Sequence, residues 1–229
     1  ELIVVAQDTT AYGEDIYGES KLPELLTELC KIEGLHWIRT LYTYPDRITD
    51  KLLDTIAREQ KLVKYLDIPL QHVNGEILKR MNRKGDCESL SDLIDKIRVK
   101  IPDITLRTTI ITGFPGETEE QFCEMAEFVK EKRFDRLGCF TYSAEEGTLA
   151  AEFPDQIDEQ VKADRMENIM ELQMTISAEK NEEKAGTVTE VLIEGWDDYI
   201  KCYFGRTAAD APEVDGKIFF MSSRPLKIG

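Results

Sequence analysis

The chain has 229 residues, with 45 acidic against 29 basic residues and a formal charge of −16. This length accommodates one large domain, or one domain and a small module. The negative charge disfavours nucleic acid as a general partner and favours basic partners, although a local basic stripe is compatible with it. No apolar run reaches the roughly 18 residues of a membrane-spanning helix, so we expect no membrane span.

The cysteines are an odd and dispersed set with no C-x-x-C pair: Cys30, Cys87, Cys123, Cys139 and Cys202. This pattern indicates reduced thiols in the cytoplasm rather than a disulfide framework. It also gives no ligand set for zinc or for an iron–sulfur cluster. Glu1 leads directly into the apolar run 2–6, which lacks the flanks of a signal peptide. We therefore expect the chain to begin inside a domain.

Short apolar strands alternate with helical patterns along the first 142 residues. We predict strands at 2–6, 36–42, 63–68, 105–111 and 134–142, and helices at 23–31, 49–60, 77–81, 90–100 and after Thr118. Five alternations with short connections predict a parallel sheet with right-handed crossovers, as in an α/β barrel. A polar loop follows each strand, so Gln7, Tyr44, Gln71, Gly113 and Ser143 are expected to converge on one face.

The remaining residues have a different character. A long helical pattern runs from Ile157 to about Asn181, with Val161, Ile169, Leu172 and Ile176 as its apolar positions. Two strands are then predicted around the turn 195–198, and a third at 217–220 after the hairpin signal of residues 215–216. We expect a barrel domain over residues 1–182 and a small all-β module over residues 183–229.

The stretch 105–118 combines a strand, a glycine turn and a helix start. Residues 105–111 are rich in β-branched side chains, Gly113 and Gly116 bracket the turn, and Thr118-x-x-Gln121 fits a capping box. This order places backbone N–H groups at the carboxyl edge of a sheet, where α/β folds bind ligands. A tight turn that needs two glycines explains the pattern equally well.

Several side chains near these loops are candidates for binding. Arg107, a charge in an apolar strand, must be paired or reach a solvated pocket, where it could hold a carboxylate. Glu117 could accept from a ligand hydroxyl, or it could favour the helix start. Gln71–His72 could bind a ligand or have a structural role, and Tyr142 could stack on a planar group. No nucleophile–base set is present, so these residues alone indicate a ligand-binding α/β barrel.

Three blocks carry a family resemblance: Ala6–Gly13, Tyr65–His72 and Gly113–Thr118. They resemble the methylthiotransferases, which are radical S-adenosylmethionine enzymes, over roughly residues 1–180, and the terminal module resembles their TRAM domain. The blocks at 134–138, 142–148 and 210–216 resemble the branch that adds a methylthio group to the β-carbon of an aspartate in a small-subunit ribosomal protein. Residues 184–229 carry six basic and seven acidic residues, which suits a basic protein substrate better than tRNA.

The resemblance implies a partial (β/α)6 barrel without its first strand, S-adenosylmethionine as cofactor and two 4Fe–4S clusters. The cluster cysteines are expected upstream of Glu1, so none of the five cysteines is assigned as a ligand and no catalytic residue is assigned in this chain. In the family, a reduced cluster cleaves S-adenosylmethionine, the adenosyl radical abstracts hydrogen from the aspartate, and the second cluster supplies sulfur. The resemblance implies that the following residues bind the cofactor: Gln7, Thr9, Gln71, Arg107, Ile111, Gly113, Gly116, Glu117 and Tyr142.

Within that set, the resemblance places Gln7 and Thr9 at the methionine end, Arg107 at its carboxylate or the ribose, and Tyr142 with the glycine turn beside the adenine. The implied partner is a basic ribosomal protein bound through the TRAM-like module, with no membrane and with the reductant unspecified. Residues 1–229 alone are expected to lack methylthiotransferase activity. Three alternatives stay open: a tRNA-adenosine methylthiotransferase, a non-catalytic module that binds RNA or a ribosomal protein, and a barrel enzyme acting on a phosphorylated metabolite. The last is weakened by the absence of a lysine near the glycine turn.

Overall fold

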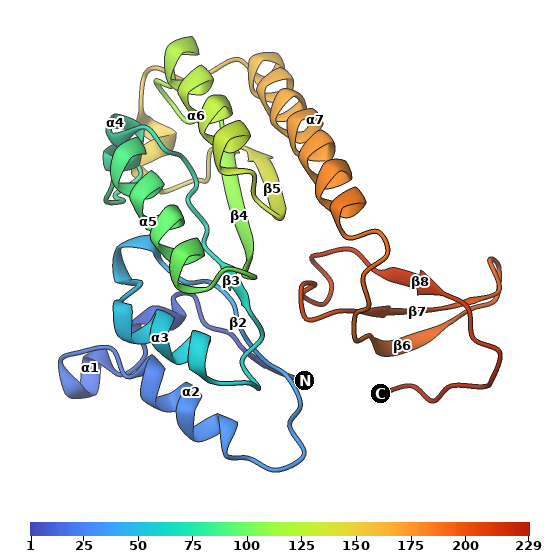
Figure 1. Ribbon diagram of the computed structural model, residues 1–229. Helices are drawn as coiled ribbons and strands as arrows, with labels where there is room; N and C mark the ends of the chain where they lie inside the picture. The colour runs from blue at the N-terminus through green and yellow to red at the C-terminus, as the bar shows by residue number, and fades with distance from the viewer.

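A computed structural model describes residues 1–229 and contains a curved set of parallel strands. The strands are β1 (Leu2–Val4), β2 (Ile38–Thr40), β3 (Tyr65–Asp67), β4 (Thr105–Thr112) and β5 (Arg136–Thr141). Strands β1 and β2 pair in one sheet, and β3, β4 and β5 pair in a second. A parallel bridge joins Ile38 of β2 to Leu62, just before β3. Figure 1 shows β2 and β3 next to each other. The predicted parallel α/β architecture is confirmed.

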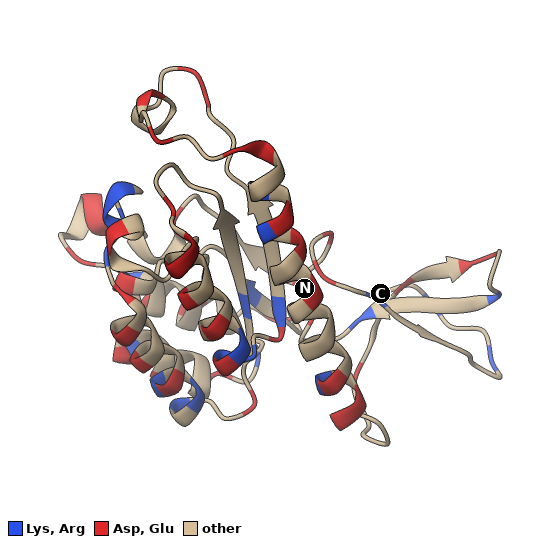
Figure 2. Cartoon of the chain, turned by 90° about the horizontal axis from the view of Figure 1, so that it is seen from above, with Lys and Arg blue, Asp and Glu red and all other residues tan.

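The helices follow the strands in alternation. They are η1 (Thr9–Ala11), α1 (Glu14–Tyr17), α2 (Leu22–Cys30), η2 (Pro45–Arg47), α3 (Asp50–Arg58), α4 (Gly75–Arg80), α5 (Cys87–Lys100), α6 (Glu119–Lys132), η3 (Leu149–Glu152) and α7 (Glu159–Glu183). Thr118 and Gln121 form the predicted capping box, because each side chain accepts from the other residue's backbone N–H. The main apolar core lies between the strands and the helices and includes Leu66, Ile110 and Phe122. Acidic residues are spread over the helices around it (Figure 2).

Helix α7 runs along β5 and leads toward the second part of the molecule (Figure 1). Its buried positions are Lys162, Arg165, Ile169, Gln173 and Ile176, which repeat at three- and four-residue intervals. Of the apolar positions of the predicted helical pattern, Ile169 and Ile176 are buried, whereas Val161 is exposed. The charged residues Lys162 and Arg165 occupy the first two turns of the stripe, where they reach polar partners described below. No helix of the chain combines the length and the apolar character needed to cross a bilayer.

The carboxyl-terminal residues form an antiparallel sheet of β6 (Leu192–Asp197), β7 (Cys202–Arg206) and β8 (Ile218–Phe220). The predicted turn at 195–198 was misplaced: the chain reverses after Asp197, whose carboxylate accepts from the backbone N–H groups of Tyr199 and Ile200. Gly195 instead lies within β6, at an irregularity in the register. A Cβ atom there would lie 2.5 Å from the ring of Phe204, so glycine is needed for strand packing rather than for a turn.

The loop Thr207–Asp215, which we call the plug loop, follows β7 and fills the amino edge of the barrel. Arg39 donates from Nη1 to the carbonyl oxygen of Ala208 at 3.0 Å. The Tyr65 hydroxyl donates to Asp215 Oδ2 at 2.6 Å, and Arg136 Nη2 donates to the Asp210 carboxylate at 2.6 Å. These contacts join the first residues of β3 and β5 to the module through charged and polar groups.

Candidate functional site

A cavity of about 670 Å³ opens at the carboxyl edge of β3, β4 and β5. Gln71 follows β3, Ile111 and Phe114 come from β4 and its turn, and Tyr142 follows β5. Leu149, in the loop before α7, lines the same space. The volume and the mixture of apolar walls with a few polar groups are those of a small-molecule site. We refer to it as the carboxyl-edge cavity.

Two polar atoms at this cavity have no partner in the protein. Gln71 Oε1 and the Tyr142 hydroxyl are both buried and form no hydrogen bond. An unsatisfied buried polar group costs about 1–3 kcal/mol, so both atoms gain when a ligand supplies a partner. Gln71 is also held in a left-handed backbone conformation, with φ of 68°, and its N–H and C=O bond to Thr109 and Ile111. Strained backbone of this kind is typical of functional sites.

The residues that line the carboxyl-edge cavity fit an adenosine group. The side chains of Ile111 and Phe114 offer apolar surface to a planar ring, and the Phe114 and Tyr142 rings meet edge to face with centroids 5.2 Å apart. The free oxygen of Gln71 can accept a hydrogen bond, and the Tyr142 hydroxyl can donate or accept one. These are the groups that recognition of a nucleoside requires.

The glycine turn beside the cavity is explained by side chains packed over it. Gly113 and Gly116 have φ of +70° and +81°, a conformation that favours glycine. A Cβ atom would lie 2.2 Å from Lys162 Cγ at Gly113 and 2.0 Å from Arg80 Nη1 at Gly116. The backbone N–H of Gly113 donates to Glu117 and that of Gly116 to the carbonyl of Asp155. Both N–H groups are therefore used inside the protein, which argues against a phosphate cradle.

Glu117 is bound by groups of the protein itself. Its carboxylate is fully buried, with Oε2 accepting from the Gly113 backbone at 3.0 Å and Oε1 accepting from Arg165 Nη1 at 2.8 Å. Both oxygens thus have donors from the protein, and neither faces the carboxyl-edge cavity. Acceptance from a ligand hydroxyl therefore stays a prediction.

Arg107 lies in the other half of β4, away from the carboxyl-edge cavity. Its Nη1 lies 2.7 Å from the Asp67 carboxylate, and its Nε lies 3.6 Å from that of Asp215 in the plug loop. Burial lowers the pKa of Arg107, but the Asp67 carboxylate outweighs this effect, so the pKa is raised above its usual range. The side chain lines a separate cavity of about 460 Å³ between β5, α7 and the plug loop. A contact of Arg107 with the cofactor stays a prediction.

Gln7 and Thr9 are also absent from the lining of the carboxyl-edge cavity. Thr9 is buried, and its hydroxyl donates to the carbonyl oxygen of Leu41 at 2.8 Å, while Gln7 is exposed. Their placement at the methionine end stays a prediction. Of the strand-end residues expected to converge, the structure brings Gln71 and Ser143 to one cavity.

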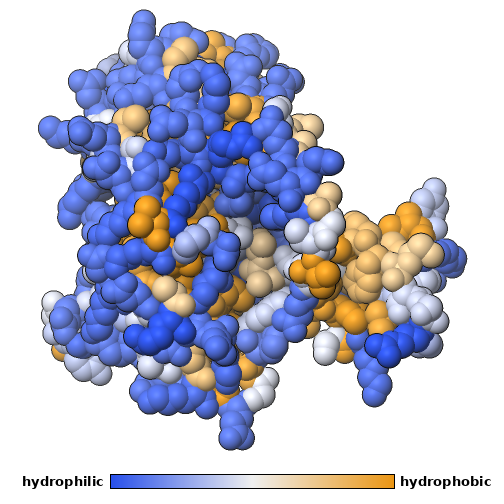
Figure 3. All heavy atoms as spheres, in the orientation of Figure 1, coloured by the Kyte–Doolittle hydropathy of each residue, from blue (hydrophilic) through white to orange (hydrophobic).

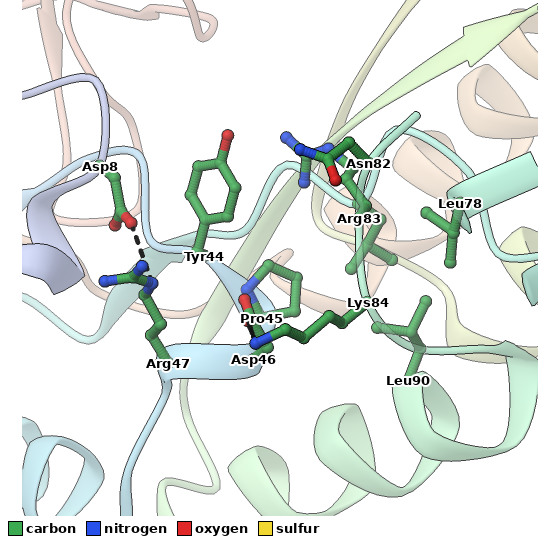
Figure 4. Close-up of a pocket in the computed structure, with 11 residues that line it drawn as sticks. Asp8, Tyr44, Pro45, Asp46, Arg47, Leu78, Asn82, Arg83, Lys84 and Leu90 are labelled. Atoms are coloured by element: carbon green, nitrogen blue, oxygen red, sulfur yellow. Dashed lines mark ion pairs between the residues drawn. The ribbon is translucent and has the colours of Figure 1, made fainter. Parts of the chain in front are cut away.

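Tyr44, the strand-end residue that follows β2, lines a neighbouring cavity of about 270 Å³ (Figure 4). This smaller cavity shares Asn82 and Arg83 with the carboxyl-edge cavity. The Arg83 guanidinium lies 4.6 Å from the centre of the Tyr44 ring, and burial lowers the pKa of this arginine. The dashed lines in Figure 4 mark the pairs Arg47–Asp8 and Lys84–Asp46, each 3.4 Å long, whereas Arg83 donates to the carbonyl oxygen of Pro69.

Several residues of the site were not anticipated from the sequence. Phe140 and Ala150 line the carboxyl-edge cavity, and Arg80 pairs with Asp155 beside the glycine turn. Lys162 donates to the carbonyl of Tyr142 at 3.2 Å. The sequence offered one indication of these residues: a charged residue, Lys162, stands at a position of the long helix that its spacing predicts to be buried.

The cysteines are free thiols, and no group of three or more His, Cys, Asp or Glu side chains is arranged to hold a metal ion. Burial raises the pKa of the Cys139 thiol to about 12, as expected of an unreactive core residue. Both statements, on free thiols and on metal ligands, concern only the side chains of residues 1–229.

Comparison with known proteins gives two matching family models: the radical SAM superfamily over residues 2–129 and the TRAM domain over residues 185–229. The ribosomal protein uS12 methylthiotransferase RimO of Alkaliphilus oremlandii is 52% identical over 223 residues, which cover 97% of this chain and 51% of that protein. RimO of Thermoanaerobacter sp. is 51% identical over 229 residues, which cover 100% of this chain and 52% of that protein. The chain thus spans about half the length of the curated relatives that it matches.

A solved structure shows the same fold. The radical SAM enzyme coproporphyrinogen III oxidase (HemN) of Escherichia coli aligns with a TM-score of 0.55 and 25% identity, covering 68% of this chain and 36% of that one. The superfamily model, for its part, matches more than half of the present chain. The protein therefore belongs to the radical SAM superfamily.

Proposed function

We propose that the protein acts in a methylthiotransferase that modifies ribosomal protein uS12, at the β-carbon of an aspartate. In this proposal residues 1–182 form the barrel that binds S-adenosylmethionine, and residues 183–229 form the module that contacts the substrate protein. The relatives with about 50% identity over the whole chain support the assignment, because they are named for this activity. A ribosomal substrate and reduced thiols favour a cytoplasmic location.

The observation that carries the cofactor assignment is the pair of unpartnered polar atoms at the carboxyl-edge cavity. Gln71 Oε1 and the Tyr142 hydroxyl would bond to the adenosine group, and Ile111 and Phe114 would pack against it. When bound, S-adenosylmethionine and two iron–sulfur clusters would supply the radical chemistry and the sulfur. The free cysteines are spread over separate elements, which supports cluster ligands outside residues 1–229. The role of this chain is then to bind and orient the cofactor.

The substrate side of the proposal rests on the β-module. Figure 3 shows apolar surface gathered over this module, whereas the barrel is largely hydrophilic on the same face. Trp196, Tyr199 and Phe219 of the module are exposed, and the exposed fraction of Tyr199 reaches 95%. Aromatic groups of this kind are typical of protein interfaces. The overall charge of −16 favours a basic protein over tRNA as the partner.

Calorimetric titration with S-adenosylhomocysteine tests the cofactor assignment on the 229-residue chain. Tyr142→Phe removes one unpartnered hydroxyl, and we expect about 5-fold weaker binding, the effect of losing one net hydrogen bond. Tyr199→Phe is the matched control, because the same hydroxyl is removed from an exposed tyrosine of the module. Equal affinity of the Tyr142→Phe variant and the wild type would contradict the assignment.

Binding of purified uS12 and of tRNA distinguishes the two substrate classes. We expect uS12 to bind, and Tyr199→Ala with Phe219→Ala to weaken that binding by at least about 10-fold if they are interface anchors. Tight tRNA binding that falls steeply with salt, together with no binding of uS12, would instead support the tRNA-modifying alternative.

A further inference from the structure

A buried set of three charged or titratable side chains lies behind the glycine turn. His72 follows β3, Glu117 follows the turn after β4, and Arg165 comes from α7. The exposed side-chain fractions are 0% for His72, 0% for Glu117 and 8% for Arg165. None of the three lines the carboxyl-edge cavity, so direct contact with a ligand there does not explain them.

The hydrogen bonds of His72 define its protonation. Its Nδ1 accepts from the backbone N–H groups of Val73 and Asn74, both at 2.9 Å. A nitrogen that accepts two hydrogen bonds carries a lone pair, so the ring is neutral and its proton is on Nε2. Nε2 has no hydrogen-bond partner at normal distance, and it lies 3.4 Å from Glu117 Oε2. The Nε2 atom therefore lies beside the carboxylate without forming a hydrogen bond to it.

The Glu117 carboxylate connects three segments of the chain. Oε2 faces His72 and accepts from the backbone N–H of Gly113, while Oε1 accepts from Arg165. Gly113 lies between Ile111 and Phe114, both of which line the carboxyl-edge cavity. Because glycine at φ of +70° has wide conformational freedom, its peptide needs an acceptor to hold one orientation.

We propose that His72, Glu117 and Arg165 are positioning residues for the cofactor site. Arg165 holds the Glu117 carboxylate through an ion pair, and the buried His72 ring packs against it at 3.4 Å. The carboxylate fixes the Gly113 N–H and with it the wall formed by Ile111 and Phe114. The fixed position of Phe114 in turn helps to place Tyr142, because the two rings pack against each other. This inference rests on the proposed function, since it assigns these residues a role in S-adenosylmethionine binding.

The test uses the 229-residue chain and nuclear magnetic resonance. Nitrogen spectra of labelled histidine should show His72 as the neutral Nε2–H tautomer, and His36→Gln identifies the resonances of the other histidine of the chain. In His72→Ala we expect amide hydrogen exchange at Gly113 to accelerate about 10-fold or more and S-adenosylhomocysteine affinity to fall about 5-fold. His36→Ala, at an exposed histidine, is the matched control and should change neither quantity.

Conservative variants separate positioning from stability. His72→Gln can place an amide N–H near the position of Nε2, so we expect partial rescue of both the Gly113 exchange rate and the affinity. Glu117→Gln keeps an acceptor for Gly113 but loses the ion pair with Arg165, so we expect weaker binding of S-adenosylhomocysteine, and this variant replaces His72→Ala if the latter does not fold. Unchanged Gly113 exchange and unchanged affinity in folded His72→Ala, or unchanged affinity in folded Glu117→Gln, would overturn the positioning role alone. Failure of the wild type to bind S-adenosylhomocysteine would instead overturn the proposed function.

Discussion

The two edges of the barrel differ in how their polar side chains are bound. At the carboxyl edge, the unpartnered atoms of Gln71 and Tyr142 belong to side chains with no other side-chain hydrogen-bond partner, beside apolar walls. At the amino edge, Tyr65 and Arg136 bind carboxylates of the plug loop, although Arg136 Nε and Arg39 Nη2 have no partner of their own. Unpaired groups have a cost in stability, whereas paired ones hold segments together. The comparison indicates that the carboxyl edge is organised for a ligand and that the amino edge holds the module against the barrel.

The largest effect is expected when the amino edge loses one partner of an ion pair. Arg136→Ala leaves the Asp210 carboxylate buried without its 2.6 Å partner, and we expect a loss of about 3–5 kcal/mol in the free energy of unfolding. Denaturation by urea measures this loss. Arg58→Ala, which removes an exposed partner of Glu59, is the control and should cost less than about 1 kcal/mol. Similar losses in both variants would show that the amino edge is not a stabilising contact.

A smaller effect is expected from Gly113→Ala at the carboxyl edge. The added Cβ meets Lys162 Cγ at 2.2 Å, and the φ of +70° is unfavourable for alanine. We expect a loss of about 1–3 kcal/mol in the free energy of unfolding, because the added methyl group overpacks the turn. We also expect weaker binding of S-adenosylhomocysteine.

Gly147→Ala is the matched control for that variant, because Gly147 has φ of +82° with no atom within 4 Å of the added Cβ. It shares the backbone penalty without the clash, so the difference between the two variants isolates the packing of Lys162 over the turn. An equal loss of stability in both variants would mean that this packing contributes nothing.

The smallest expected effect is a change in the free energy of unfolding at acid pH. Burial raises the pKa of Asp210, but hydrogen bonds from Thr207 and Arg136 outweigh it and hold the pKa below its usual range. A carboxyl whose folded-state pKa is depressed adds stability above its unfolded pKa of about 3.9, and that stability is lost as pH falls through the folded pKa. The difference in unfolding free energy between wild type and Asp210→Asn should therefore shrink below about pH 4. A constant difference from pH 6 to pH 3 would contradict the role of this ion pair.

Local patterns in the sequence predicted the strands and the glycine turn well. The run 105–111 is β-branched and ends in a glycine turn, so strand β4 and the cavity wall beside it follow from neighbouring residues. The convergence of Gln71 and Ser143 also follows, because parallel strands end on the same face. The role of Gly195, however, was not predicted. The sequence indicated a turn residue, but the ring of Phe204 across the sheet requires glycine at this position inside a strand.

Long-range pairing accounts for what the sequence could not predict. Arg136 meets Asp210 across 74 positions, and Tyr65 meets Asp215 across 150. Nothing near Arg107 in the sequence indicates that Asp67 and Asp215 are its partners, so a ligand carboxylate was an equally reasonable expectation. Glu117 is a similar case, because its donor Arg165 lies 48 positions away in α7.

A titration of the labelled 229-residue chain with S-adenosylhomocysteine, followed by amide resonances, compares both edges at once. The account predicts shifts for Ile111, Gly113 and Tyr142 at the carboxyl edge and none for Asp210 and Asp215 in the plug loop. Shifts confined to the plug loop and Arg107 would contradict it, because the ligand would then occupy the amino edge.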